Sequence, residues 1–177
     1  MGSKLLKPFK RGVSFENSTW YKGLLTTELV AAKQTGGAFE VITAQVKAGT
    51  EPPPHVHARE HEFFYLLEGI IDVYVGSEVF RVSAGESIFM PKGIPHAVRG
   101  QTPEYHVLVF LTPGGFMSAI QSMAIPAERL EIPEDMPTYA TVDLAETAKI
   151  FDKYGIRFLS PEEIEEQMPT YPVRQAV

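Results

Sequence analysis

Short apolar runs punctuated by glycine and proline fill the chain from about Trp20 to Leu111. The runs are rich in valine, isoleucine, phenylalanine and tyrosine, and they recur about every 8 to 12 residues, which is typical of antiparallel strands. No long helical pattern separates them, so a sandwich or small barrel is favoured over an α/β fold. The clearest predicted strands are FEVITAQV, EFFYLLEG, IIDVYVG, EVFRV and ESIFMP, which start at positions 39, 62, 70, 78 and 86.

The apolar spacing becomes helical after the sequence LTPGG. Phe116, Ile120 and Met123 would lie on one face of a short helix. Two further short helices are predicted to start near Asp143 and Ser160, because aspartate and serine are favourable N-cap residues. We therefore expect an all-β fold with short helices near the C-terminus.

Length and composition fit a single domain. The chain has 177 residues, of which 44% are hydrophobic, and this is enough to build one sizeable core. Neither internal repeats nor low-complexity tracts are evident. We predict one domain over residues 1–177, with a barrel core at about 20–112 and a helical extension at about 113–177.

The charge distribution excludes some classes of partner. The formal net charge is −6, and the densest basic group is Lys4, Lys7, Lys10 and Arg11, so neither a nucleic-acid surface nor an anionic membrane is an expected partner. No segment approaches the roughly 18 apolar residues of a membrane span, and the N-terminus lacks the apolar run of a signal peptide. A cytoplasmic protein is the expectation.

The densest polar cluster is HVHAREHE, at residues 55–62. Side chains alternate across a strand, so His55 and His57 project from one face and can converge on one point. Glu62 lies out of phase with them, so the chain must bulge or turn within the intervening AREH if all three are to meet. His61 points to the face opposite Glu62 and is the histidine least expected to bind.

A fourth ligand is available at His96, because the preceding MPKGIP is a turn that can return the chain across a barrel. An isolated histidine on a strand is usually solvated or hydrogen-bonded, but this spacing favours a metal site. The chain has no cysteine, so a metal must be held by histidine, carboxylate or water. We expect His106 to have a structural or surface role.

Three histidines and one carboxylate leave positions open on an octahedral ion. Such a set suits one divalent metal ion of Fe, Mn, Co or Ni, and zinc is possible with a closed tetrahedral site. Open positions imply that a small-molecule substrate or dioxygen binds directly at the ion.

These residues resemble the two motifs of the cupin superfamily, G(x5)HxH(x4)E(x6)G and G(x5)PxG(x2)H(x3)N. The matched positions are Gly49, His55, His57, Glu62 and Gly69 in the first motif and Gly85, Pro91, Gly93 and His96 in the second. Gly100 replaces the last asparagine, which is not a metal ligand in the family. The resemblance implies a double-stranded β-helix, or jelly-roll barrel, with His55, His57, Glu62 and His96 as the metal ligands.

A closer resemblance is carried by TGGAFEV, PPPHVHAREHEFFYLLEG, LTPGGF and DLAETAKIFDKYGIRFL. Together these are similar to the single-cupin quercetin dioxygenases and their relatives. That subfamily opens the heterocycle of a flavonol with dioxygen and releases carbon monoxide, using one metal held by three histidines and one glutamate. The resemblance therefore implies a dioxygenase with a flavonol-like or other enolisable aromatic substrate.

For such an enzyme, the hypothesis is that Glu62 is both a ligand and the catalytic acceptor of a substrate proton. Phe64 and Phe116 are the candidates for contacting an aromatic substrate, and the alternative is that both are core residues. Met117 stands where these relatives often have a polar or acidic residue, which weakens any transfer of substrate identity.

Other functions remain open, because cupin barrels host unrelated activities. The alternatives are a non-catalytic cupin that binds a metal or small ligand, and a cupin isomerase. A homodimer is expected, since strands with two aliphatic faces are commonly covered by a second copy.

Overall fold

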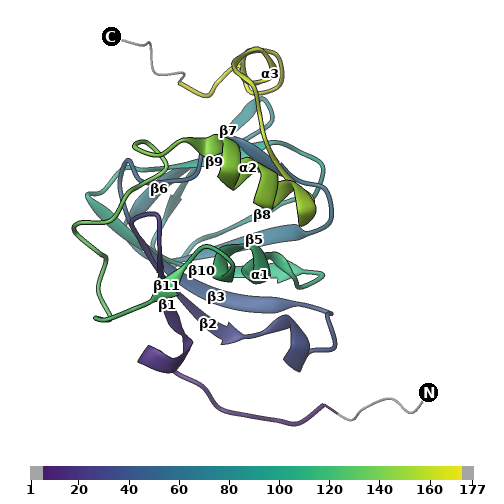
Figure 1. Ribbon diagram of the computed structural model, residues 1–177. Helices are drawn as coiled ribbons and strands as arrows, with labels where there is room; N and C mark the ends of the chain where they lie inside the picture. Colours follow the sequence, from purple (N-terminus) through teal and green to yellow (C-terminus); the bar gives the residue numbers. More distant parts are fainter. Residues whose placement is uncertain (1–5, 173–177) are drawn as a thin grey trace.

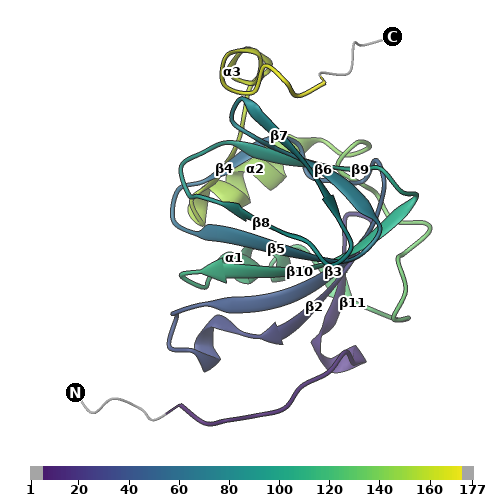
Figure 2. The same cartoon turned by 180° about the vertical axis from the view of Figure 1, so that it is seen from behind.

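Two antiparallel sheets face each other across an apolar interior (Figures 1 and 2). A computed structural model describes residues 6–172 of the chain. The strands are β1 (Ser18–Tyr21), β2 (Leu24–Val30), β3 (Glu40–Lys47), β4 (His55–His57), β5 (His61–Glu68), β6 (Ile70–Val75), β7 (Glu78–Ser83), β8 (Ser87–Met90), β9 (His96–Gly100), β10 (Glu104–Thr112), β11 (Ile125–Pro126) and β12 (Ile156–Phe158).

The larger sheet has seven strands in the order β11-β1-β2-β3-β10-β5-β8, and the smaller has five in the order β12-β4-β9-β6-β7. In Figure 1 the five-stranded sheet is the upper layer and the seven-stranded sheet the lower one. The chain passes from one sheet to the other after β3, β4, β5, β7, β8, β9 and β11. This architecture confirms the expected jelly-roll barrel, and the five quoted strands all form.

Strand β10 shows how the sequence pattern builds the interior. Tyr105, Val107, Val109 and Leu111 are buried, and the residues between them are half-buried. Because successive side chains point to opposite faces, one face of β10 lines the barrel and the other looks outward. The same alternation buries Leu66 on β5.

The helices follow the predicted order. They are the 3₁₀ turns η1 (Phe15–Asn17) and η2 (Ala32–Gln34) and the α-helices α1 (Phe116–Gln121), α2 (Leu144–Lys153) and α3 (Pro161–Gln167). Asp143 caps α2 by accepting the Ala145 amide at 2.9 Å, and Ser160 caps α3 by accepting the Glu163 amide at 3.3 Å. No described helix has the length and apolarity needed to cross a membrane.

The C-terminal segment also contributes two short strands. Strand β11 pairs with β1 at the edge of the larger sheet, and β12 pairs with β4 in the smaller one. Helices α1 and α2 both lie on the side of the barrel that faces the viewer in Figure 1. The segment after residue 112 is therefore built into both sheets and covers one side of the barrel.

A buried carboxylate fixes the start of α1. Glu40, which is 1% exposed, accepts the amide of Gly115 at 3.0 Å and that of Met117 at 2.9 Å. These amides are among the donors that a helix start leaves without an internal partner. Burial raises the pKa of Glu40, and the two amide hydrogen bonds oppose the rise. Met117 is itself buried, so its side chain packs into the core.

Candidate metal centre

The four predicted ligands come from both sheets. His55 and His57 lie on β4, and His96 begins the neighbouring strand β9, where it pairs directly with His55. Strand β4 ends at His57, and β5, which carries Glu62, begins in the facing sheet. The intervening residues 58–60 form no strand, as the phase of the sequence required, and this break turns Glu62 toward the histidines.

The ligand atoms of these four residues converge. One atom from each of His55, His57, Glu62 and His96 lies within 4.8 Å of the others. The imidazole centroids are 4.6 Å apart for His55 and His96 and 5.4 Å for His57 and His96. His57, Glu62 and His96 are 1%, 6% and 2% exposed. Such dense burial of polar groups needs a compensating partner.

Backbone carbonyls orient two of the imidazoles. His55 Nδ1 lies 2.9 Å from the carbonyl oxygen of Pro53, and His96 Nδ1 lies 3.2 Å from that of Ile94. An Nδ1–H that donates to a carbonyl leaves Nε2 as the lone-pair nitrogen. His55 and His96 therefore present Nε2 to the cluster, and this is the usual support of a metal-binding histidine.

Glu60 is the corresponding partner of His57, and the sequence analysis missed it. Its Oε2 atom lies 3.4 Å from His57 Nδ1, and the Glu60 side chain is 5% exposed. Within residues 6–172, neither atom has a well-oriented hydrogen-bond partner, so the two make a close approach. The carboxylate therefore faces one side of the imidazole while the other side faces the cluster.

The electrostatics keep the donor set ready to bind a cation. Burial would raise the pKa of Glu62, but the contact with His96 and the charges of the three histidines outweigh it and lower the pKa to about 2. Burial, followed by repulsion from His96 and His57, holds the pKa of His55 well below its usual range. At neutral pH Glu62 is ionised and His55 is a neutral ligand.

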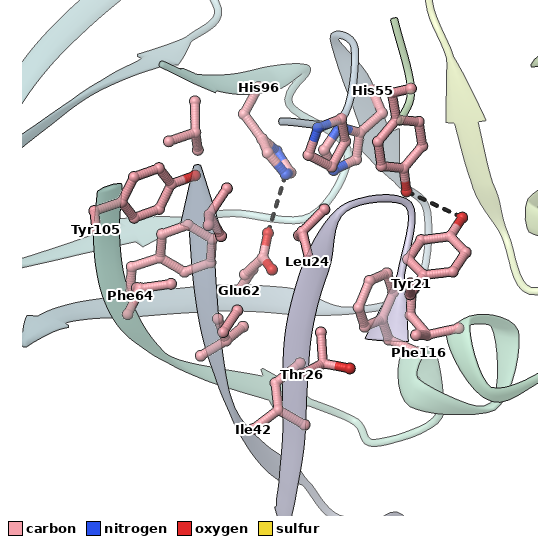
Figure 3. A pocket seen from close by; sticks show the side chains of 18 residues that line it. Tyr21, Leu24, Thr26, Ile42, His55, Glu62, Phe64, His96, Tyr105 and Phe116 are labelled. Carbon is pink, nitrogen blue, oxygen red and sulfur yellow. Dashed lines mark hydrogen bonds and ion pairs between the residues drawn. The ribbon is translucent and has the colours of Figure 1, made fainter. Parts of the chain in front are cut away.

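These residues fit a divalent metal ion. His57 Nε2 and His96 Nε2 are buried without a well-oriented hydrogen-bond partner among the described residues. His96 Nε2 lies 3.1 Å from Glu62 Oε2 (Figure 3). Two ligand atoms bound to one ion at about 2.1 Å are separated by about 3 to 4 Å. The cluster of three histidines and one glutamate thus suggests a metal site.

A cavity of about 100 Å³ adjoins the cluster. His55, Glu62 and His96 form part of its wall, and most of the remaining wall is apolar, as Figure 3 shows. Phe64 and Phe116 both line it, and both also pack against the hydrophobic core. The structure therefore brings the two aromatic candidates to the cavity wall and gives each a packing role.

Three tyrosines that the sequence analysis did not single out also line the cavity. The Tyr139 hydroxyl donates to the Tyr21 hydroxyl at 3.1 Å, whereas Tyr105 comes from β10 on the far side of Glu62 in Figure 3. The alternation of buried Tyr105 with outward His106 was a usable signal. Tyr139 had none, because it lies 118 residues from its partner.

The remaining two histidines lie outside the cluster. His61 accepts the Lys92 amide at 3.3 Å and stacks on Phe89 with ring centroids 5.6 Å apart. His106 is on β10 and turns away from the cavity, and burial lowers its pKa. Gly100, the departure from the second motif, donates its amide to Glu51 Oε1 at 2.7 Å.

The fold and the cluster together define a cupin. Residues 42–112 match the family model described as Cupin domain, and they contain all four residues of the cluster. This region of the chain is a cupin domain.

Among curated proteins, the chain is similar to quercetin 2,3-dioxygenase from Bacillus subtilis (strain 168), with 24% identity over 133 residues. The match covers 72% of this chain and 38% of that protein, so the chain spans less than half of the relative's length.

Two solved structures share the fold. An RmlC-like cupin from Shewanella frigidimarina NCIMB 400 has a TM-score of 0.51 and 18% identity, over 62% of this chain and 96% of that one. Streptomyces PAC13 with uridine has a TM-score of 0.50 and 16% identity, over 68% of this chain and 92% of that one.

Proposed function

We propose that this cupin is a metal-dependent dioxygenase that acts on a flavonol or another enolisable aromatic compound. The convergence of His55, His57, Glu62 and His96 beside an apolar cavity is the observation that carries the proposal. The similarity to a quercetin 2,3-dioxygenase supports this choice of reaction.

The proposed ligands are His55, His57, Glu62 and His96, and the proposed ion is Fe(II), Mn(II), Co(II) or Ni(II). Three nitrogens and one oxygen leave two positions free on an octahedral ion, whereas tetrahedral zinc would have none. When bound, such an ion supplies Lewis acidity that favours the ionised form of a substrate hydroxyl. The three Nδ1 contacts keep the imidazoles aimed at the same point.

Glu62 is the proposed proton acceptor. Its carboxylate is ionised at neutral pH, lines the cavity, and has one oxygen, Oε2, in contact with His96. A carboxylate has acceptor sites on both oxygens, so it can hold a ligand contact and still receive a hydrogen bond from a substrate hydroxyl. Removal of that proton gives an electron-rich enolate, which is the form that dioxygen attacks.

The cavity wall suits an aromatic body. Phe64, from β5, and Phe116, at the start of α1, are the proposed contacts. Aromatic rings in a dry wall favour edge or offset stacking with a ligand ring. The surrounding aliphatic side chains exclude water from the reacting atoms, which protects a reactive intermediate from side reactions.

The test is turnover of quercetin in air by protein reconstituted with each metal separately. We expect quercetin absorbance to fall with equimolar uptake of dioxygen and release of carbon monoxide. Glu62→Gln should retain the fold and lose at least about a hundredfold in rate, which is typical for removal of a general base. Glu68→Gln is the matched control, because Glu68 is exposed on the same strand.

Each result separates the candidate functions. Binding of quercetin without carbon monoxide release, for every metal, would contradict the dioxygenase and favour a non-catalytic cupin. Conversion to an isomer without dioxygen uptake would favour an isomerase. Full activity in Glu62→Gln would refute the proton-acceptor role alone.

A homodimer in the cytoplasm is the proposed form of the protein. Tyr65, Leu67 and Phe89 are exposed on β5 and β8, which end one side of the larger sheet. A second copy laid on this face would remove those side chains from water. Light scattering after gel filtration tests it, and a monomer at micromolar concentration would contradict the dimer.

A further inference from the structure

Tyr105, the second residue of β10, lines the cavity. Its side chain is 5% exposed, and it lines the same cavity as His55, Glu62 and His96. In Figure 3 the ring lies on the opposite side of Glu62 from Tyr21, and its hydroxyl points into the space between the labelled side chains. Tyr105 lies close against Gly69, because a side-chain carbon at Gly69 would be 2.8 Å from Tyr105 Cβ.

The Tyr105 hydroxyl has no protein partner. Among residues 6–172 no hydrogen bond reaches it, and burial is the main cause that raises its pKa well above the usual range. Two other buried aromatic side chains have paired polar atoms: Tyr139 donates to Tyr21, and Trp20 Nε1 donates to the Glu131 carbonyl at 2.9 Å. The Tyr105 hydroxyl is not among the fully enclosed unpaired atoms, so it keeps surface that a group in the cavity can reach.

A neutral hydroxyl that faces a cavity is available to a ligand. Val46 pairs with Tyr105 across the sheet, and Val107 and Val109 from the same strand also line the cavity. A ligand there meets the metal cluster and the Tyr105 hydroxyl in a wall that is otherwise largely apolar. Ligand sites with a few fixed polar groups in an apolar wall owe their specificity to those groups.

We infer that Tyr105 is a substrate-binding residue whose hydroxyl pairs with a second oxygen of the substrate. The inference rests on the proposed function and narrows its substrate class. The substrate is an enolisable aromatic compound that carries, besides its metal-binding oxygens, a further phenolic hydroxyl or carbonyl oxygen. An aromatic enol without that oxygen leaves Tyr105 unpaired and binds more weakly.

The experiment compares two ligands and three proteins. Quercetin carries several ring hydroxyls, whereas the parent flavonol has only the adjacent hydroxyl and carbonyl that chelate a metal. Each is titrated without oxygen into metal-loaded wild-type protein, Tyr105→Phe and the control Tyr65→Phe, whose hydroxyl is on the exposed face of β5. Dissociation constants come from the absorbance change of the bound flavonol.

We expect Tyr105→Phe to weaken quercetin binding about five- to tenfold, the loss of one hydrogen bond, and to leave the parent flavonol within about twofold. Tyr65→Phe should change neither. An equal change for both ligands in Tyr105→Phe, or no change for either, would overturn the role of Tyr105 while the proposed function stands. If neither flavonol binds the wild-type protein, the proposed function fails first, and this inference fails with it.

A second measurement needs no ligand. Removal of a cavity-facing hydroxyl that has no protein partner should leave the melting temperature of the metal-free protein unchanged or raise it. A clear fall for Tyr105→Phe would mean that the hydroxyl has a structural partner within the protein, and that result would overturn the inference.

Discussion

Glu40 and Glu62 are two buried carboxylates in the same barrel with different surroundings. Glu40 has both oxygens paired with amides at the start of α1, whereas Glu62 faces three imidazoles and, among residues 6–172, forms an ion pair only with His96. Burial raises the pKa of Glu40, and the histidines lower that of Glu62 to about 2. Glu40 therefore stabilises the start of α1. Glu62 still has acceptor sites that can bind a metal ion or a substrate.

The comparison gives a way to tell structural from functional polar groups inside a small barrel. A polar group whose donors and acceptors are satisfied within the chain stabilises the fold, and its loss costs free energy of unfolding. A buried group whose donors or acceptors are incompletely paired can still bind a metal or a substrate. Variants of the two kinds should therefore change different measurements.

The largest expected effect is on metal content. His57→Ala removes one of four ligands, and we expect it to lose at least about a thousandfold in affinity for the divalent ion, because the remaining donors no longer enclose it. The measurement is metal per chain by elemental analysis after dialysis. His61→Ala, which alters a histidine outside the cluster, is the matched control and should retain the ion.

Equal metal content in His57→Ala and the wild type would contradict the site. If His61→Ala loses metal to the same degree, metal affinity depends on the conformation of residues 58–61 and not on the four ligands alone. Folding of both variants is checked by circular dichroism before the metal is measured.

A smaller effect, on stability, is expected at Glu40. Glu40→Ala leaves two helix-start amides buried without an acceptor, and we expect the free energy of unfolding to fall by about 2–4 kcal/mol. Urea denaturation of the metal-free protein measures it, and metal affinity of the folded variant should not change. Exposed Glu78→Gln is the control, expected within about 0.5 kcal/mol of the wild type. Loss of metal without loss of stability in Glu40→Ala would reverse the assignment of the two carboxylates.

The sequence predicted the cluster because its signals are local. The HxH alternation places His55 and His57 on one face, and the glycine and proline turn before His96 returns the chain to the next strand. The same local patterns predicted the strands of the barrel and the helix starts at Asp143 and Ser160.

What the sequence did not predict depends on pairing between distant segments. Strands β11 and β12 have two and three residues, too few for a periodic pattern. Tyr139 lines the cavity from the segment between β11 and α2, which forms neither helix nor strand. Glu60 lies between β4 and β5, where no strand periodicity assigns its side chain to a face. These residues needed the tertiary structure.

Glu60 provides the smallest and most selective prediction, because it touches the site without belonging to the cluster. Its carboxylate faces His57 Nδ1 at 3.4 Å, so it fixes the ring with Nε2 toward the other ligands. Glu60→Ala removes the acceptor, and we expect metal affinity to fall about 10- to 100-fold, the usual effect of losing such a support. Competition with a coloured chelator measures the dissociation constant directly.

The conservative variant Glu60→Gln separates orientation from charge. Its amide oxygen can still accept from Nδ1–H, so if the carboxylate acts by holding the ring, affinity should fall less than about tenfold. If Glu60→Gln is as weak as Glu60→Ala, the negative charge matters more than the hydrogen bond. Wild-type affinity in both variants would show that the ring is held by packing alone, for which stacking against His96 at 5.4 Å and contact with Phe116 at 5.3 Å are the available restraints.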